Sequence, residues 1–384
     1  MSGVQFSSFY FAKELKKYKE INYQILLPKK GEFSELCHVC SIPYKVYNAM
    51  PYLSTSFSFF TDSFRIPNPL AWVFNMFSIT YNGIIIRPII KMQPKAVVLS
   101  KGLLSHFVSI IACIDANNFL IWHLQDLVSN RYGGLLRFLF NFFAKNNPNS
   151  IICDGKSIKS ILTTRIKTKC KIVLNGIDEN EFQRDEAKRK NIRHEFDIPS
   201  SAYVIGHVGR ITPWKGQEIL LDAFIKYSVK NTNAYLLLIG DSMFDNDKYY
   251  KKLKSKISDA GLNHRIKMPG FRSDLDAIYS ALDLYIYPSL EKDTSPLALL
   301  SALVSGLPVF ISRIPSLKEI GDIVPALRSF DVSNKDELIN ILVEFEDSIK
   351  RNKIGPKIQK EAIISFSISR HTEDLLSIIR SSIR

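Results

Sequence analysis

An arginine and a lysine five positions apart flank a tight turn in the segment GHVGRITPWKG, residues 206–216. They are Arg210 and Lys215, and Gly209 directly precedes the arginine. Arginine can hold two phosphate oxygens at once, lysine adds a compact positive charge, and the following helix start offers backbone N–H groups. The pattern therefore predicts a diphosphate site, although two cations beside a turn can also be merely solvated. Its spacing fits neither a Walker loop nor a dinucleotide glycine motif, which disfavours ATPases and NAD enzymes.

A second polar turn lies in the segment LYIYPSLEKDTSPLALLSALVSGLPVF, residues 284–310. Its pattern predicts a strand, a polar loop, an apolar helix and another strand. The expected helix start is marked by Asp293, Thr294, Ser295 and Pro296. Ligands of open α/β sheets bind at the carboxyl ends of strands, and a helix start preceded by a carboxylate suits a phosphate or a polyhydroxylated group. An ordinary capped crossover helix would have the same pattern.

Apolar strands alternate with helices along most of the chain. In the first half we expect strands at 96–100, 119–123, 150–154 and 171–174. In the second half we expect them at 203–208, 234–239, 265–268, 284–287, 307–311 and 324–327. This alternation predicts an α/β protein with two Rossmann-like domains facing a cleft. The Asn175-Gly176 turn separates them, so we expect domains at 1–175 and 176–365 and a closing segment at 366–384.

The first domain begins unusually. A glycine turn at Gly3 leads into an amphipathic helix expected near 6–19, and the first strands are expected only at 23–27 and 40–47. A domain of this class normally opens with a strand. We therefore expect that the central first strand is missing from this sequence, and that the natural product begins upstream with a strand of about 5 to 10 residues.

The positive charge of the chain lies in its first half. The net charge is +14, with 21 basic and 8 acidic residues in 1–175 but 30 and 29 in 176–384. A one-sided basic surface with interspersed aromatic residues favours an anionic membrane surface, although solvated helix faces and core aromatics explain part of the same composition. Nucleic acid is disfavoured because no recognised binding motif is present.

A long apolar segment at 70–90 approaches the length of a membrane span. The interruptions favour a buried or interfacial helix over a span, and they are Asn75, Asn82, Gly83, Arg87 and Pro88. Five scattered cysteines without a secretory signal indicate free thiols in a reducing compartment. No second pair lies at ligand spacing from Cys37 and Cys40, so we interpret them as buried or idle thiols. Asp245-Asn246-Asp247 resembles a metal-binding sequence but lies in a charged loop, where we expect it to be solvated.

Three motifs together carry a family resemblance. GRITPWKG, VLNGID and EKDTSPLALLSALVSGLPV resemble the nucleotide-sugar glycosyltransferases of the GT-B fold, specifically glycosyltransferase family 4. SGVQFSSFYFAKEL resembles the opening of that family, and SFSISRHTEDLLSII its closing segment, whose final helix crosses back onto the first domain. The resemblance implies transfer of a sugar from a nucleotide-diphosphate sugar to a hydroxyl of a lipid-linked or polysaccharide-precursor glycan. It further implies retention of configuration, with neither metal nor cofactor.

The resemblance also implies roles for individual residues. Arg210 and Lys215 match the pair that binds the donor diphosphate and stabilises the leaving group, and together with Asp293 they form the implied catalytic set. Two acidic positions eight apart match Asp293, beside the donor sugar, and Ser301, which keeps only a hydroxyl for the ribose. The whole implied donor site comprises Gly209, Arg210, Lys215, Gly270, Phe271, Arg272, Asp293, Thr294, Ser295, Pro296, Leu297 and Ser301.

In the first domain, the sequence WHLQD resembles the segment where the family often has a histidine near the donor sugar. That position is Gln125 here, with His123 and Asp126 beside it, and Gly3 matches the glycine loop. The expected location is the cytoplasmic face of a membrane, with peripheral attachment. Gln125 and Ser301 depart from the family pattern, which leaves open a non-catalytic nucleotide-sugar-binding relative. A GT-B epimerase or phosphorylase is the other alternative.

Overall fold

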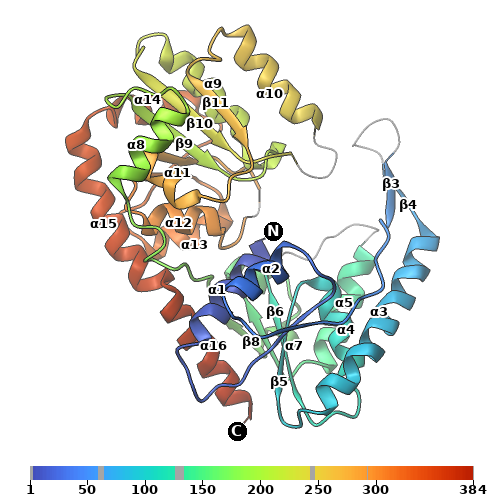
Figure 1. Ribbon diagram of the computed structural model, residues 1–384. Helices are drawn as coiled ribbons and strands as arrows, with labels where there is room; N and C mark the ends of the chain where they lie inside the picture. The colour runs from blue at the N-terminus through green and yellow to red at the C-terminus, as the bar shows by residue number, and fades with distance from the viewer. Residues whose placement is uncertain (1–2, 59–64, 126–133, 243–246, 292, 384) are drawn as a thin grey trace. The chain divides into compact units, whose positions relative to one another are not determined.

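The structure is a computed structural model that describes residues 3–58, 65–125, 134–242, 247–291 and 293–383. The chain divides into two compact units (Figure 1). Unit 1 comprises Met1–Leu174 and His371–Arg384, and unit 2 comprises Asn175–Arg370. Each unit is built on parallel strands with intervening helices, which confirms the predicted pair of Rossmann-like α/β domains.

Unit 1 contains a four-stranded parallel sheet in the order β5-β6-β7-β8. A separate parallel pair, β1-β2, and an antiparallel pair, β3-β4, make up its other sheets. Its strands are β1 (Ile25–Leu27), β2 (Tyr44–Val46), β3 (Ser56–Ser58), β4 (Arg65–Pro67), β5 (Val97–Lys101), β6 (Phe119–Leu124), β7 (Ser150–Cys153) and β8 (Cys170–Ile172). Its helices are α1 (Gly3–Leu15), α2 (Glu32–Val39), α3 (Pro69–Lys91), α4 (Leu103–Ala112), α5 (Leu135–Asn146), α6 (Lys156–Ser160), α7 (Thr164–Lys167) and most of α16 (Ile368–Ile383).

The strands of the β5–β8 sheet are apolar at consecutive positions, so apolar side chains point to both faces of the sheet. Helices therefore cover both faces. Leu120 and Trp122 of β6 point to one face, where they pack with Phe140 of α5. Ile121 points to the other face and packs with Phe11 of α1 and with Leu375 and Leu376 of α16. The closing helix therefore joins the core of unit 1, as the family resemblance implies.

Unit 2 contains six parallel strands in the order β11-β10-β9-β12-β13-β14. They are β9 (Tyr203–Val208), β10 (Ala234–Ile239), β11 (Ile266–Gly270), β12 (Leu284–Tyr287), β13 (Val309–Ser312) and β14 (Arg328–Phe330). The helices are α8 (Glu186–Glu195), η2 (Pro213–Lys215), α9 (Gln217–Ser228), α10 (Asp247–Asp259), α11 (Leu275–Ala281), α12 (Leu297–Val304), α13 (Pro315–Ile323), α14 (Lys335–Glu344) and α15 (Ser348–Phe366). The strand order reverses between β9 and β12, so the loops that leave these strands diverge and open a binding position between them.

One predicted strand is misplaced. The segment 324–327 is apolar and was expected to be a strand, but Val324 caps α13 and a turn follows it. The strand is β14, which begins at Arg328, and two of its three residues are exposed. Burial of apolar side chains at a helix end gave the same sequence signal as a buried strand.

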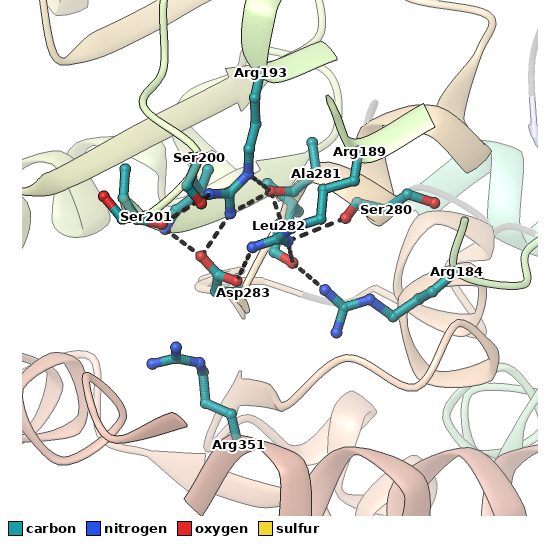
Figure 2. Close-up of polar contacts among 12 residues, drawn as sticks. Arg184, Arg189, Arg193, Ser200, Ser201, Ser280, Ala281, Leu282, Asp283 and Arg351 are labelled. Carbon is teal, nitrogen blue, oxygen red and sulfur yellow. Dashed lines mark hydrogen bonds and ion pairs between the residues drawn. The ribbon is translucent and has the colours of Figure 1, made fainter. Parts of the chain in front are cut away.

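A buried ion-pair cluster fixes the amino end of β12. Asp283 accepts a hydrogen bond from Arg189 at 2.7 Å, another from Arg193 at 2.7 Å, and a third from the backbone N–H of Val204 at 2.8 Å. Figure 2 shows both guanidinium groups directed at this carboxylate and at the carbonyls that end α11. Burial disfavours the charged carboxylate, but the two arginines outweigh it and lower the pKa of Asp283. The start of β12 is thereby tied to α8 and to β9.

Candidate functional site

Lys215 and Asp293 meet at the point where the strand order of unit 2 reverses. Lys215 follows β9 and Asp293 follows β12, and Lys215 Nζ lies 2.5 Å from Asp293 Oδ2. The same carboxylate oxygen accepts hydrogen bonds from Tyr287 and, at 3.2 Å, from Ser289. Lys215 is 7 % exposed and Asp293 9 % exposed. Two residues predicted from separate motifs therefore form one buried ion pair.

Burial controls the protonation of this cluster. It lowers the pKa of Lys215, and the neighbouring carboxylate of Asp293 offsets only part of that effect. Burial also raises the pKa of Tyr287 well above its ordinary value, so the phenol stays neutral and can donate to Asp293. An ammonium group has three N–H donors. Among the described residues, Tyr287 and Asp293 occupy two of the donors of Lys215, which leaves one for a ligand.

Gly216 lets the two loops touch. Its φ of +72° lies in the left-handed region, and a Cβ at this position would stand 2.0 Å from the carbonyl oxygen of Pro288. No other residue type fits there without displacing the loop after β12. The backbone N–H of Leu290 also donates to the carbonyl of Trp214 at 2.8 Å. The glycine in the motif GRITPWKG therefore brings the lysine to the aspartate.

Trp214 stands between the two predicted cations. The Arg210 guanidinium lies 5.5 Å from the centre of the indole ring, and Lys215 Nζ lies 4.5 Å from it. Arg210 is exposed, so its guanidinium is accessible to a ligand. A cation held against an aromatic ring loses rotational freedom without losing charge. Sequence reasoning missed Trp214, although its place between Arg210 and Lys215 in the motif was a visible signal.

A polar chain behind the site also escaped sequence reasoning. His207 in β9 is bonded through Nδ1 to the carbonyl of Ile286 at 3.0 Å, and Gln217 bonds to His207 Nε2 at 3.4 Å. Gln217 also donates to the carbonyl of Arg210 at 2.7 Å. Burial lowers the pKa of His207 to about 4, so the ring is neutral and its Nδ1–H donates. The chain connects β12 to the backbone of Arg210.

The start of α12 follows Asp293 as predicted, with Pro296 as N-cap and Leu297 as first residue. Ser295 adopts a left-handed φ of 45°, and Asn175 holds it there with one hydrogen bond to its hydroxyl and one to its carbonyl. Thr294 is half-buried between these anchored residues. Ser301 is buried in the second turn of α12. The junction turn at Asn175 is thus part of the wall of the predicted site.

The loop after β11 lies two strands away from the switch point. Gly270 has a φ of +87° and Phe271 is exposed. Arg272 forms hydrogen bonds with Asp274 and Glu195, which raise the pKa of its guanidinium. Its charge is therefore already paired within the protein.

Two of the predicted residues of unit 1, His123 and Gln125, belong to a second buried polar cluster. His123 at the end of β6 lies with Nε2 2.5 Å from Asp154, and burial lowers the histidine pKa. Gln125 donates to Asp154 at 3.2 Å and to Ser7 of α1 at 3.0 Å. Lys101 also donates to Ser7, at 3.2 Å, and burial lowers its pKa to about 8.

Three members of this cluster, Ser7, Lys101 and Asp154, were not predicted. Lys101 ends β5 and Asp154 follows β7, positions at the carboxyl ends of strands that the pattern of the sequence could have indicated. Gly3 begins α1, and Asp126 lies outside the described residues. Within the described parts of the chain, no three His, Cys, Asp or Glu side chains gather to hold a metal ion, and the five cysteines are free.

Comparison with known proteins finds a family model that matches most of unit 2. The family model described as "Glycosyl transferases group 1" matches residues 188–359. The chain is 26 % identical over 223 residues to the "O-antigen biosynthesis glycosyltransferase WclY" of Escherichia coli, covering 58 % of each chain. It is 25 % identical over 244 residues to the "UDP-Gal:alpha-D-GlcNAc-diphosphoundecaprenol alpha-1,3-galactosyltransferase" of Escherichia coli. That match covers 61 % of this chain and 60 % of the relative, so the matched length is under two thirds of either relative.

Solved structures match the whole chain. Anabaena Alr3699/HepE, in complex with UDP and glucose, superposes with a TM-score of 0.79 at 21 % identity, over 99 % of this chain and 96 % of that chain. A glycosyltransferase from Rickettsia africae superposes with a TM-score of 0.79 at 18 % identity, over 100 % and 95 %. The family model therefore matches within unit 2, and the chain as a whole has the GT-B fold.

Proposed function

We propose that the protein is a glycosyltransferase that moves a sugar from a nucleotide-diphosphate sugar to a hydroxyl acceptor, with retention of configuration. The observation that carries the proposal is the buried Lys215–Asp293 pair beside the exposed Arg210, at the switch point of a group 1 domain. A UDP-sugar is the first donor to test, because solved neighbours of the same fold are complexes with UDP and with UDP-glucose.

The site residues divide the work of such a transfer. Arg210 can fork onto two diphosphate oxygens, and the remaining N–H of Lys215 can reach a third, so the charge that grows on the leaving group is offset as the sugar bond breaks. These two cations supply the positive charge that a divalent metal supplies in other transferases, and we propose that neither a metal nor a cofactor takes part. Asp293 receives a sugar hydroxyl and balances the positive charge at the anomeric carbon.

Ser301 and the loop at Gly270 complete the donor side in this proposal. The Ser301 hydroxyl bonds to the ribose, more weakly than a carboxylate would, and the backbone at Gly270 meets the base. The acceptor is a lipid-linked or polysaccharide-precursor glycan, as the names of the O-antigen and diphosphoundecaprenol relatives indicate for those proteins. Such an acceptor places the enzyme at the cytoplasmic face of a membrane.

Two measurements on the full chain test the proposal. A panel of nucleotide sugars is first screened by thermal shift, since a ligand that binds only the folded state raises the midpoint of unfolding. The binding donor is then incubated with bacterial lipid extract, and transfer of labelled sugar to the lipid fraction is measured. We expect one UDP-sugar to raise the midpoint and to label the lipid.

The products separate the alternatives. A donor that binds without any turnover indicates a non-catalytic relative. An isomerised nucleotide sugar indicates an epimerase, and transfer of the sugar to added inorganic phosphate, giving a sugar 1-phosphate without lipid, indicates a phosphorylase. If none of the nucleotide sugars changes the unfolding midpoint and none is consumed, the proposed function is wrong.

A further inference from the structure

Helix α3 of unit 1 is amphipathic with its polar side turned inward. Asn75 exchanges two hydrogen bonds with the backbone of Leu53, at 2.8 and 2.9 Å. Asn82 does the same with Met50, at 2.7 and 3.1 Å, and Ser78 donates to the carbonyl of Pro51 at 2.9 Å. These three polar side chains are buried. They bind residues 50–53 along one side of the helix.

The opposite side of α3 is an exposed apolar stripe. The residues that form it recur at helical spacing and are Leu70 (81 % exposed), Val73 (68 %), Met76 (67 %), Phe77 (60 %), Tyr81 (44 %) and Ile84 (56 %). The rings of Phe77 and Tyr81 stack along the stripe with centroids 6.4 Å apart. Soluble proteins rarely expose a continuous row of large apolar side chains, and such a row marks an interaction site.

The rest of unit 1 holds α3 firmly in this orientation. At Gly83 the helix approaches α4 so closely that a Cβ would stand 2.6 Å from Cβ of Ile111. Ile86 and Ile90 of α3 are buried with Val108 and Ala112 of α4. In Figure 1, α3 lies on the outer side of α4, along the border of unit 1. Rotation of α3 to bury the stripe would break both this contact and the hydrogen bonds to residues 50–53.

The positive charges near α3 indicate what kind of partner the stripe binds. Lys91 ends the helix on the exposed side, and Lys95 follows in the next turn. Most of the net charge of +14 falls on the first 175 residues. Apolar and aromatic side chains next to lysines match the interfacial region of an anionic bilayer. By length and composition α3 could also cross a membrane, but its buried asparagines are already bonded to the protein, so the helix fits the plane of the surface.

We propose that the α3 stripe docks unit 1 on an anionic lipid bilayer, with the helix lying in the interface. Phe77 and Val73 enter the boundary between headgroups and acyl chains, and Lys91 and Lys95 meet the phosphates. The docking is independent of the transfer activity, because it uses neither the switch point of unit 2 nor the buried cluster of unit 1.

Vesicle co-sedimentation of the full chain tests this docking. We expect binding to vesicles of phosphatidylcholine mixed with phosphatidylglycerol, weaker binding to phosphatidylcholine alone, and a loss of binding as salt is raised. Val73→Asp should weaken the binding about tenfold, because it places a carboxylate in the stripe. Val229→Asp is the matched control, since Val229 is 78 % exposed and lies in unit 2, and it should bind like the wild type.

Three outcomes would overturn the proposal. The first is equal binding by the wild type and the Val73→Asp variant, and the second is a lack of wild-type binding to either vesicle. The third is a concentration-dependent dimer in light scattering that the Val73→Asp variant abolishes, which would assign the stripe to a second copy of the chain. A circular dichroism spectrum like that of the wild type verifies that the variant is folded.

Discussion

Strand β12 of unit 2 carries a buried carboxylate at each end, and the two are held differently. At the amino end, Asp283 is bound by two arginines and a backbone N–H. Beyond the carboxyl end, Asp293 is bound by one lysine, a tyrosine and a serine. The two carboxylates are ten positions apart in the sequence, and Asp283 precedes β12 whereas Asp293 follows it. Their surroundings show which end is built for stability and which for a ligand.

At the amino end, Arg193 has no donor left for a ligand. All five N–H donors of Arg193 have protein acceptors, from the carbonyls of Ala281, Pro199, Ser200 and Ala202 to Asp283 itself. The carboxyl end retains the third N–H of Lys215 and the exposed guanidinium of Arg210. A guanidinium whose donors are all bonded to the protein can only hold the backbone in place. A lysine with an unused donor beside an exposed arginine can bind a ligand. Four predictions test this contrast.

The largest expected effect is at the amino end. Arg193→Met leaves Asp283 buried with half of its cationic partners, and should cost about 3 to 5 kcal/mol in the free energy of unfolding. Urea unfolding measures this loss. Arg184→Met is the control, because Arg184 is exposed and makes one hydrogen bond here, at 2.8 Å to Leu282 (Figure 2), so it should cost about 1 kcal/mol or less. Equal costs for the two variants would contradict the structural role of Asp283.

Within unit 2, His207 should respond to acid before Asp283 does. The pKa of His207 is about 4 in the folded protein against 6.5 for the free side chain, so its contribution to stability is present above pH 6.5 and is lost as pH falls towards 4. That loss amounts to about 3 kcal/mol. The pKa of Asp283 is lowered from 3.8, so its contribution is lost only at more acidic pH.

The variant His207→Gln isolates the histidine in this titration. Between pH 6.5 and 4, the free energy of unfolding should fall less steeply in the variant than in the wild type, by up to about 1.4 kcal/mol per pH unit. Below pH 4 the two proteins should lose stability alike. Urea titrations at several pH values measure both segments. Parallel curves for the variant and the wild type would show that another group controls this range.

At the carboxyl end the expected loss is in activity. The double variant Lys215→Met with Asp293→Asn removes both charges of the pair, so neither is left buried alone and the stability should change by about 1 kcal/mol or less. Transfer should fall about a hundredfold or more in kcat/KM, because the leaving group loses its fixed cation. A variant that unfolds easily but transfers normally would reverse the roles of the two ends.

The sequence revealed one of these ends and not the other. Lys215 and Asp293 could be predicted because each follows an apolar strand within a polar turn. The pairing of Asp283 with Arg193 could not, because the partners are 90 positions apart and the aspartate precedes the strand, where no ligand was expected. Tyr287 was missed for a related reason, since an aromatic side chain in an apolar strand looks like core.

The orientation of helix α3 could not be predicted from the sequence either. Asn75 and Asn82 were identified from the sequence as interruptions that argue against a membrane span. Periodicity places them on one side of the helix, but it does not say that this side faces the protein. Only the loop at 50–53 supplies the acceptors and donors that bury them, and its course depends on tertiary contacts.

The smallest expected effect concerns Ser301, in the second turn of α12 after the carboxyl end of β12. The proposed ribose contact is a hydroxyl here, whereas the resemblance implies a pocket built for a carboxylate. Ser301→Glu should fold and should bind UDP up to about fivefold more tightly, since a charge-assisted hydrogen bond contributes roughly 1 kcal/mol more than a neutral one. Ser301→Gln, of similar size but neutral, is the control and should gain less. Calorimetric titration with UDP measures both variants, and a Ser301→Glu protein that folds but has lost UDP binding would show that the pocket around Ser301 has been rebuilt for another nucleotide or for none.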